Sequence, residues 1–297
     1  QSRVLCMHID SERGMQMSVR EFDVAILRDT VEEFCGKLAC DLPDDVHCAI
    51  ERALDREDGP TARQVLDDLL LNCDIAAKER VPMCQDTGMV VAFLDVGLDV
   101  RFLGDPYEAI DEGVRRGYKK YVLRMSVVSD PLRRVNTRDN TPAMVTTRLV
   151  PGDRVTITLL SKGFGSENMS RLAMLLPADG EEGVRKFVLD TVAKAGPNAC
   201  PPFVVGVGIG GTFDQVALAA KRALARPLNE SNSDPFYAEM EQSLLAAINE
   251  LGIGPQGFGG RTTALGVAVE VLPTHIAGLP VAANINCHAA RHVQEVL

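Results

Sequence analysis

Residues 82–97 read PMCQDTGMVVAFLDVG, and the character of the chain changes within them. Before this stretch the apolar residues recur with helical spacing, whereas Met89–Val96 is an almost continuous apolar run of the length of a buried strand. The polar segment CQDTG between them has the composition of a tight turn. The stretch therefore predicts a boundary between a helical N-terminal region and a mixed body of strands and helices.

Three helices are predicted before this boundary. Capping-box pairs, in which two side chains satisfy free backbone N–H groups at a helix start, open the first and the third. The predicted helices cover 18–38, 44–56 and 61–78, with capping pairs Ser18/Glu21 and Thr61/Gln64.

After the boundary, strand-like apolar runs alternate with amphipathic helices and with loops rich in Gly and Pro. The predicted strands are 89–96, 145–150, 155–160, 203–207, 264–271 and 279–285, and the predicted helices are 107–120, 181–195, 213–225 and 235–251. The fold class expected is mixed α+β, with a disordered or expression-derived segment 1–17, a helical region 18–80 and a body 81–297 that together form one domain.

Composition excludes several classes of protein. The chain has 297 residues, 46% of them hydrophobic, and a net charge of −10, which disfavours nucleic-acid binding because that needs a basic surface. No apolar run approaches the roughly 20 residues that span a bilayer. The first residues, which begin with Gln rather than Met, resemble no signal peptide. The expectation is a cytoplasmic protein that binds neither nucleic acid nor a membrane.

Three of the eight cysteines differ from the rest in their surroundings. Cys84, Cys200 and Cys287 lie in loop-like segments rich in polar residues or proline, whereas most of the others lie in amphipathic helical patterns typical of small buried side chains. In a reducing compartment such cysteines are more often metal-bound or buried than disulfide-bonded. Three thiolates could hold a [4Fe–4S] cluster and leave one iron open as a Lewis acid.

Seven polar motifs in this order resemble the α-type domain of class I fumarate hydratases and tartrate dehydratases. The resemblance covers about Met83 to His292, some 70% of the chain. The motifs are CQDTG, LRMSVV, NTRDNTP, SKGFGSEN, ACPP, GIGPQGFGG with TTALGV, and PTHIAGLPVA followed by N and NCHAARH.

The resemblance implies roles for individual residues. Cys84, Cys200 and Cys287 would ligate a [4Fe–4S] cluster with one open iron. The substrate-binding residues implied are Gln85, Arg124, Gly163 and Gly165, and the catalytic residues implied are Asp86 and His275. Phe164 departs from the family pattern, because a glycine is common at that position. Lys162, Arg261 and Arg291 are further candidates for positive charge near an anionic substrate.

The implied activity is reversible hydration of fumarate to malate by the α subunit of a two-subunit hydro-lyase of the tricarboxylic acid cycle. Activity would need a separate β subunit, and a higher oligomer is expected. L-Tartrate and mesaconate remain alternative substrates. Two alternatives of another kind are a non-catalytic regulatory subunit without iron, and a nucleotide-binding protein that uses the G-x-G-x-x-G pattern at Gly206–Gly211.

Overall fold

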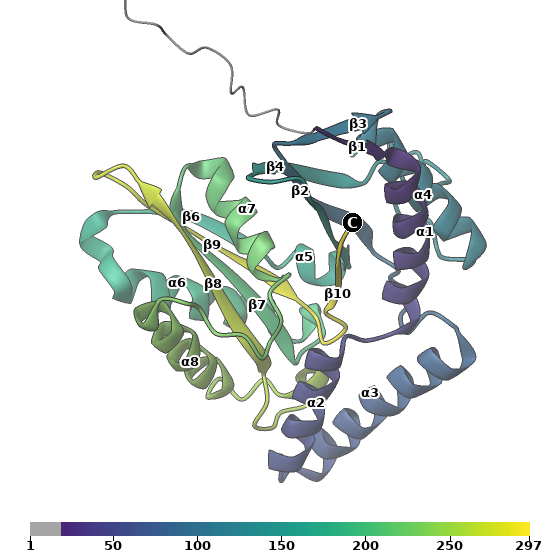
Figure 1. The fold of residues 1–297 in the computed structure, drawn as a ribbon. Helices are drawn as coiled ribbons and strands as arrows, with labels where there is room; N and C mark the ends of the chain where they lie inside the picture. The colour runs from purple at the N-terminus through teal and green to yellow at the C-terminus, as the bar shows by residue number, and fades with distance from the viewer. Residues whose placement is uncertain (1–18) are drawn as a thin grey trace, which may run out of the picture.

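The computed structural model describes residues 19–297, which form a mixed α+β fold with two four-stranded sheets (Figure 1). The expected fold class is thereby confirmed. The predictions for segment 1–17 and for Ser18 fall outside the described residues. In the part of the chain that is described, no helix is both long enough and apolar enough to cross a membrane.

The first sheet has the strand order β10-β5-β2-β4. Its strands are β2 (Met89–Gly97), β4 (Met144–Val150), β5 (Val155–Lys162) and β10 (Arg291–Val296). Side chains of β2 alternate between the two faces of the sheet, so Val90, Ala92 and Leu94 lie in one core and Val91 and Phe93 in another.

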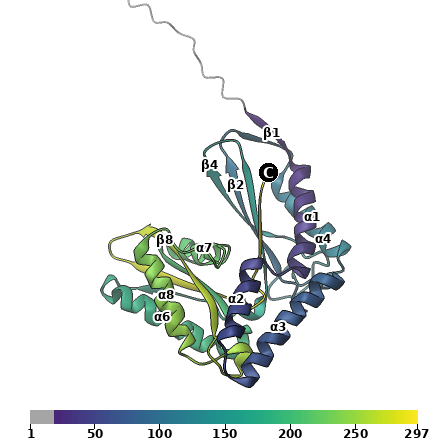
Figure 2. The ribbon, with the colours of Figure 1, turned by 60° about the horizontal axis from the view of Figure 1, so that its bottom comes forward.

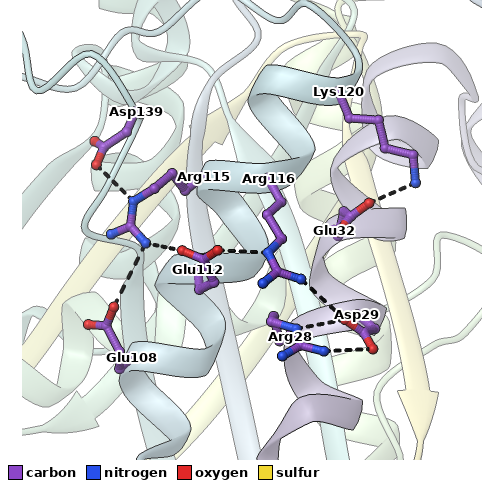
Figure 3. Close-up of polar contacts among 9 residues, drawn as sticks. All are labelled: Arg28, Asp29, Glu32, Glu108, Glu112, Arg115, Arg116, Lys120 and Asp139. Carbon is purple, nitrogen blue, oxygen red and sulfur yellow. Dashed lines mark hydrogen bonds and ion pairs between the residues drawn. The ribbon is translucent and has the colours of Figure 1, made fainter.

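Two long helices cover the first of these faces. They are α1 (Val24–Cys40) and α4 (Pro106–Lys120), whose apolar side chains share one core with β2 and β5. Along their exposed sides Arg116 bonds Glu112 and approaches Asp29, while Lys120 bonds Glu32 (Figure 3). Exposed ion pairs contribute little each, so the shared core holds these helices in place.

The second sheet has the order β6-β9-β7-β8. Its strands are β6 (Arg171–Leu175), β7 (Phe203–Gly211), β8 (Ala264–Thr274) and β9 (Leu279–Asn286). Apolar residues of α6 (Gly180–Ala195) and α8 (Pro235–Asn249) share one core with β7, β8 and β9. The helix α7 (Phe213–Ala223) packs against the sheet on the other face (Figure 1).

The glycines of the G-x-G-x-x-G pattern lie along β7, and its first two serve helix packing. A side chain at Gly206 would place its Cβ 2.1 Å from the carbonyl oxygen of Ala220, and one at Gly208 would lie 2.2 Å from that of Val216. Both carbonyls belong to α7, so these two glycines allow α7 to pack closely on the strand. A tight turn follows at Gly210 and Gly211. It lies at one end of β7, and Cys200 lies near the other end.

A third core joins the two sheets. It contains apolar residues of α2 (Asp44–Arg56) and α3 (Pro60–Glu79) together with Phe93, Leu160 and Val204. The helices α2 and α3 lie side by side at one end of the molecule (Figure 2). Cys84 and Cys287 are partly buried against this core, so the candidate ligands lie where the two sheets meet.

The remaining elements are short. Strands β1 (Arg20–Asp23) and β3 (Val100–Leu103) pair in parallel, and α5 (Phe164–Glu167) follows β5. Single 3-10 turns cover Pro177–Asp179, Gly196–Ala199 and Pro255–Gly257.

The predicted start of the first helix is wrong. Residues 20–23, predicted as helix, form β1 because they pair with β3, and the helix begins only after Asp23, whose carboxylate accepts a hydrogen bond from the Ala25 N–H. The start of the third helix is also earlier than predicted: Thr61 lies inside α3, whose first residue is Pro60. Strands β1, β3, β6 and β10 were not predicted, since they are short or rich in charged residues.

Candidate functional site

The CQDTG turn at 84–88 links β2 to the third core, and several buried groups fix its backbone. The Tyr118 hydroxyl donates to the carbonyls of Thr87 and Gly88, each over 2.9 Å, and the Ser161 hydroxyl donates to the Thr87 carbonyl over 2.6 Å. Because these bonds come from α4 and β5, the turn is held rigidly between two elements, as a ligand-binding loop requires.

The three cysteines predicted as ligands come together from three loops. Burial raises the pKa of the Cys200 thiol, and the neighbouring Cys287 and Cys84 thiols raise it further. The backbone N–H of His288 donates to the Cys200 carbonyl over 3.2 Å, which ties the loop of Cys287 to that of Cys200. Cys200 has a φ of 53°, a left-handed conformation that is strained for a residue with a side chain.

Two buried cations lie next to this group. Arg291 is 2% exposed, and its Nη2 donates to the Asp86 carbonyl over 2.9 Å. Lys162 is 1% exposed, and burial lowers its pKa to about 8 even though Glu167 works in the opposite direction. Burial raises the pKa of the Cys287 thiol, while Arg291 and Lys162 both oppose that rise. The site therefore favours negative charge locally in a chain of net charge −10.

The Asp86 carboxylate is oriented by two backbone groups. Its Oδ1 accepts a hydrogen bond from the Gly88 N–H over 3.0 Å, and its Oδ2 accepts one from the Phe164 N–H over 2.9 Å. A Cβ at Gly163 would stand 3.1 Å from Oδ2, which is a tight contact. Gly163 thus permits the close approach of the SKGFG loop to Asp86. Gly165 lies two residues further along the chain and is exposed.

A cavity of about 420 Å³ opens beside Asp86. Its volume lies in the range of small-molecule sites. Arg124 and Arg134 line it, together with Phe164 and Asn168. Arg124 is exposed and bonds the Gln85 carbonyl through Nη1 over 3.3 Å, so Gln85 and Arg124 lie side by side. A cavity with two arginines and a carboxylate suits a small anion that carries a group able to exchange a proton.

The polar loop 136–142 supports the segment that carries Arg124. The Asn140 carboxamide accepts a hydrogen bond from the Ser126 N–H over 2.7 Å and donates to the Gly88 carbonyl over 3.3 Å. Asn136 donates to the Met125 carbonyl over 2.9 Å. The loop therefore connects the Arg124 segment to the CQDTG turn.

The structure does not bring His275 to this group. His275 follows Thr274, which pairs with Gly211 at one end of β7, whereas Cys200 precedes Phe203 at the other end. It lies exposed on the loop that connects β8 to β9, beside Ile276. Arg261 is also elsewhere, because it pairs with Asp58 near the start of α3.

Sequence reasoning missed Arg134, whose signal was weak. It stands among four arginines in residues 124–138, and nothing in their spacing separates it from Arg133 or Arg138. Arg134 has a φ of 60°, and its backbone N–H donates to the Asp130 carbonyl over 3.0 Å. That turn directs its side chain to the cavity, and only the folded loop reveals it.

The three cysteines suit a cluster of several iron atoms better than a single metal ion. Among residues 19–297, no three His, Cys, Asp or Glu side chains lie close enough to share one metal ion. An iron–sulfur cube is wider than one ion, so its thiolate ligands stand further apart. Three convergent thiols beside a buried guanidinium with two unpartnered nitrogens fit an anionic cluster.

The chain is similar to known proteins over most of its length. The family model described as fumarate hydratase (Fumerase) matches residues 28–296. The chain belongs to the fumarate hydratase family. Fumarate hydratases are hydro-lyases, enzymes that add water to a double bond or remove it.

Relatives within this family share most of the chain. A protein of Methanocaldococcus jannaschii, described provisionally as an L(+)-tartrate dehydratase subunit alpha, is 41% identical over 272 residues, which are 89% of this chain and 95% of the relative. The L(+)-tartrate dehydratase subunit alpha of Escherichia coli K12 is 32% identical over 285 residues, which are 95% of this chain and 92% of the relative. The family is therefore secure over both sheets and all three cysteine loops.

Proposed function

We propose that this chain is the α subunit of a two-subunit hydro-lyase that interconverts fumarate and malate. The observation that carries the proposal is the convergence of Cys84, Cys200 and Cys287 beside a cavity that contains Asp86 and Arg124. The family match supports the reaction class, and the relatives named as alpha subunits support a separate partner chain.

Cys84, Cys200 and Cys287 are the proposed ligands of a [4Fe–4S] cluster. When bound through three thiolates, such a cluster supplies a Lewis-acidic iron for a substrate hydroxyl. The orphaned nitrogens of Arg291 and the buried Lys162 support an anionic group at this place.

The chain's own residues bind and orient the substrate. Arg124 offers a planar fork to one carboxylate, Gln85 lies beside it, and the backbone at Gly163 and Gly165 leaves room for the ligand. Asp86 exchanges a proton at the reacting carbon or hydroxyl, because its carboxylate borders the cavity and is held in one orientation. Asp86 rather than His275 takes this role, since the β8–β9 loop that carries His275 lies at the far end of β7.

L(+)-Tartrate dehydration is the second candidate. It is favoured by the names of the relatives, which are tartrate dehydratase subunits. Tartrate has one more hydroxyl than malate, and a site built to hydrogen-bond that hydroxyl discriminates strongly against a substrate without it. The two candidates therefore predict different values for kcat/KM with tartrate relative to kcat/KM with malate.

The test is anaerobic co-expression of the chain with its β chain, followed by assays on fumarate, tartrate and mesaconate. We expect turnover of fumarate with the pair and almost none with the α chain alone. Preference for tartrate by kcat/KM would establish the second candidate, and full activity without the β chain would refute the two-subunit proposal.

A spectroscopic test separates the enzyme from a regulatory subunit without iron. After anaerobic reconstitution, the visible absorption band of the cluster should be lost in Cys84→Ser, Cys200→Ser and Cys287→Ser. It should persist in Cys35→Ser, the matched control, because Cys35 is buried in the core between α1 and α4. Absence of the band from the wild-type chain would contradict the proposal.

A further inference from the structure

Arg291 is a buried cation without a carboxylate partner among residues 19–297. Its Nη2 bonds the Asp86 carbonyl, but its Nε and Nη1 are buried and have no hydrogen-bond partner. A buried guanidinium that lacks a counter-charge and two hydrogen bonds is strongly unfavourable in a folded protein. The presence of Arg291 at this buried position points to a missing group that supplies the counter-charge and accepts the two hydrogen bonds.

The strand that carries Arg291 fixes the position of its side chain. Arg291 is the first residue of β10 and pairs with Ser161 of β5, next to Lys162. Only three residues separate it from Cys287, and its positive charge lowers the pKa of that thiol. The guanidinium therefore lies between the CQDTG turn of Cys84 and the loop of Cys287.

The other groups around Arg291 do not neutralise it. The Tyr118 hydroxyl already donates to the Thr87 and Gly88 carbonyls, and the imidazole of His288 cannot supply a negative charge in either protonation state. Lys162 is a second buried cation, and the carboxylate of Glu167, 3.3 Å from its Nζ, pairs with Lys162 and not with Arg291. The missing partner must be an anion with several acceptor atoms.

We propose that Arg291 positions the cluster and balances its charge, with Nε–H and Nη1–H donating to sulfur atoms of the cluster held by Cys84, Cys200 and Cys287. This inference rests on the proposed function. It adds a residue that is not a ligand and that binds the cluster through hydrogen bonds and charge.

Two consequences separate this role from a purely structural one. Hydrogen bonds and positive charge at cluster sulfur favour the more reduced, more negative state, so Arg291 raises the reduction potential and slows cluster loss. Without the cluster the unpaired charge weakens the fold. Replacing Arg291 by an apolar residue should therefore harm the loaded protein far more than the empty one.

The experiment compares Arg291→Met, which removes the charge at similar length, with Arg291→Lys, which keeps the charge and loses the planar fork. Arg261→Met is the control, because Arg261 lies on the surface beside Asp58. Each full-length chain is reconstituted anaerobically with iron and sulfide. Iron content, the half-life of the cluster against a chelator, the reduction potential and Tm with and without cluster are measured.

We expect Arg291→Met to lose its cluster ~10- to 100-fold faster than the wild type and to shift the potential to more negative values. The Tm of its empty chain should equal or exceed that of the empty wild type, because the unpaired buried charge is gone. Arg291→Lys should shift the potential less, and Arg261→Met should match the wild type. Wild-type half-life and potential in Arg291→Met would overturn the inference, as would an equal loss of Tm with and without cluster. Failure of the wild type to take up any cluster would instead overturn the proposed function, and the inference with it.

Discussion

Asp86 shows how much of the site depends on single backbone contacts. Its two carboxylate oxygens are held by N–H groups of different loops, one in its own turn and one at Phe164. The side chain of Phe164 is half exposed and lines the cavity, while its backbone does the positioning. A larger residue than glycine is therefore tolerated at this family position, because the contact to Asp86 needs only the backbone N–H.

Asp86→Asn should reduce kcat/KM ~10²- to 10⁴-fold, because an amide cannot exchange the proton that the carboxylate exchanges. The visible spectrum of the reconstituted cluster should stay unchanged, since Cys84, Cys200 and Cys287 are intact. Asp67→Asn, on the exposed side of α3 and away from the cavity, is the control. Retention of wild-type kcat/KM in Asp86→Asn would remove Asp86 from the reaction.

Arg134→Gln should raise KM for the dicarboxylate ~10- to 100-fold, because hydrogen bonds to a charged group contribute about 1.5–3 kcal/mol. The measurement is steady-state kinetics of the two-subunit enzyme. Arg133→Gln removes the same charge from the neighbouring position, which does not line the cavity. Equal changes in KM in the two variants would indicate a general charge effect rather than contact with substrate.

At the scale of elements, the packing of α7 on β7 depends on glycine. The strand residues that face α7 are Val204, Gly206 and Gly208, and the last two allow helix carbonyls to approach the strand backbone. The same residues that suggested a nucleotide fingerprint are thus explained by helix–sheet packing. Glycines in a sequence indicate positions where another group can approach the backbone closely. Whether that group is a ligand or, as here, a helix depends on the fold.

Gly206→Ala should lower the free energy of unfolding by about 1–3 kcal/mol, because its Cβ would stand 2.1 Å from the Ala220 carbonyl oxygen and force α7 away from the sheet. Chemical denaturation of the full chain measures the change. Gly278→Ala is the control, since its nearest neighbours lie 3.9 Å away, and it should change stability by less than about 0.5 kcal/mol. A neutral effect of Gly206→Ala would contradict the tight packing.

At the scale of the whole molecule, polar contacts join the two sheets as well as the third core. Asp95 on β2 accepts hydrogen bonds from Arg148 on β4 and from Arg222 on α7, and the Arg222 guanidinium lies 4.7 Å from the centre of the Phe93 ring. Burial tends to raise the pKa of Asp95, but the two arginines outweigh it and lower the pKa. The Asp95 carboxylate, in its charged form, therefore links the first sheet to α7 of the second.

Asp95→Asn should lower the free energy of unfolding by about 1–2 kcal/mol at pH 7. Because the folded-state pKa lies below the ordinary value of 3.8, this stabilisation is present above that value and is lost as the pH falls through the folded pKa. Urea denaturation between pH 7 and pH 3 should show the wild type and the variant converging at the acid end. Asp55→Asn, on the exposed side of α2, is the control, and a pH-independent difference for Asp95→Asn would contradict this account.

The sequence by itself determined the fold class, nearly all long helices and strands, and the three distinctive cysteine loops. These follow from the spacing of apolar residues and from turn-forming residues, which are local properties. Even so, it misplaced the start of α1, because pairing of residues 20–23 with β3 overrode a local capping pattern.

Only the tertiary structure decided which distant side chains share a site. It carried Arg291 to the cysteines on the unpredicted strand β10, directed Arg134 to the cavity, and separated His275 from Asp86 by the length of β7. The reason is physical: apolar periodicity specifies which face of an element is buried, whereas the meeting of loops depends on how whole sheets and helices pack.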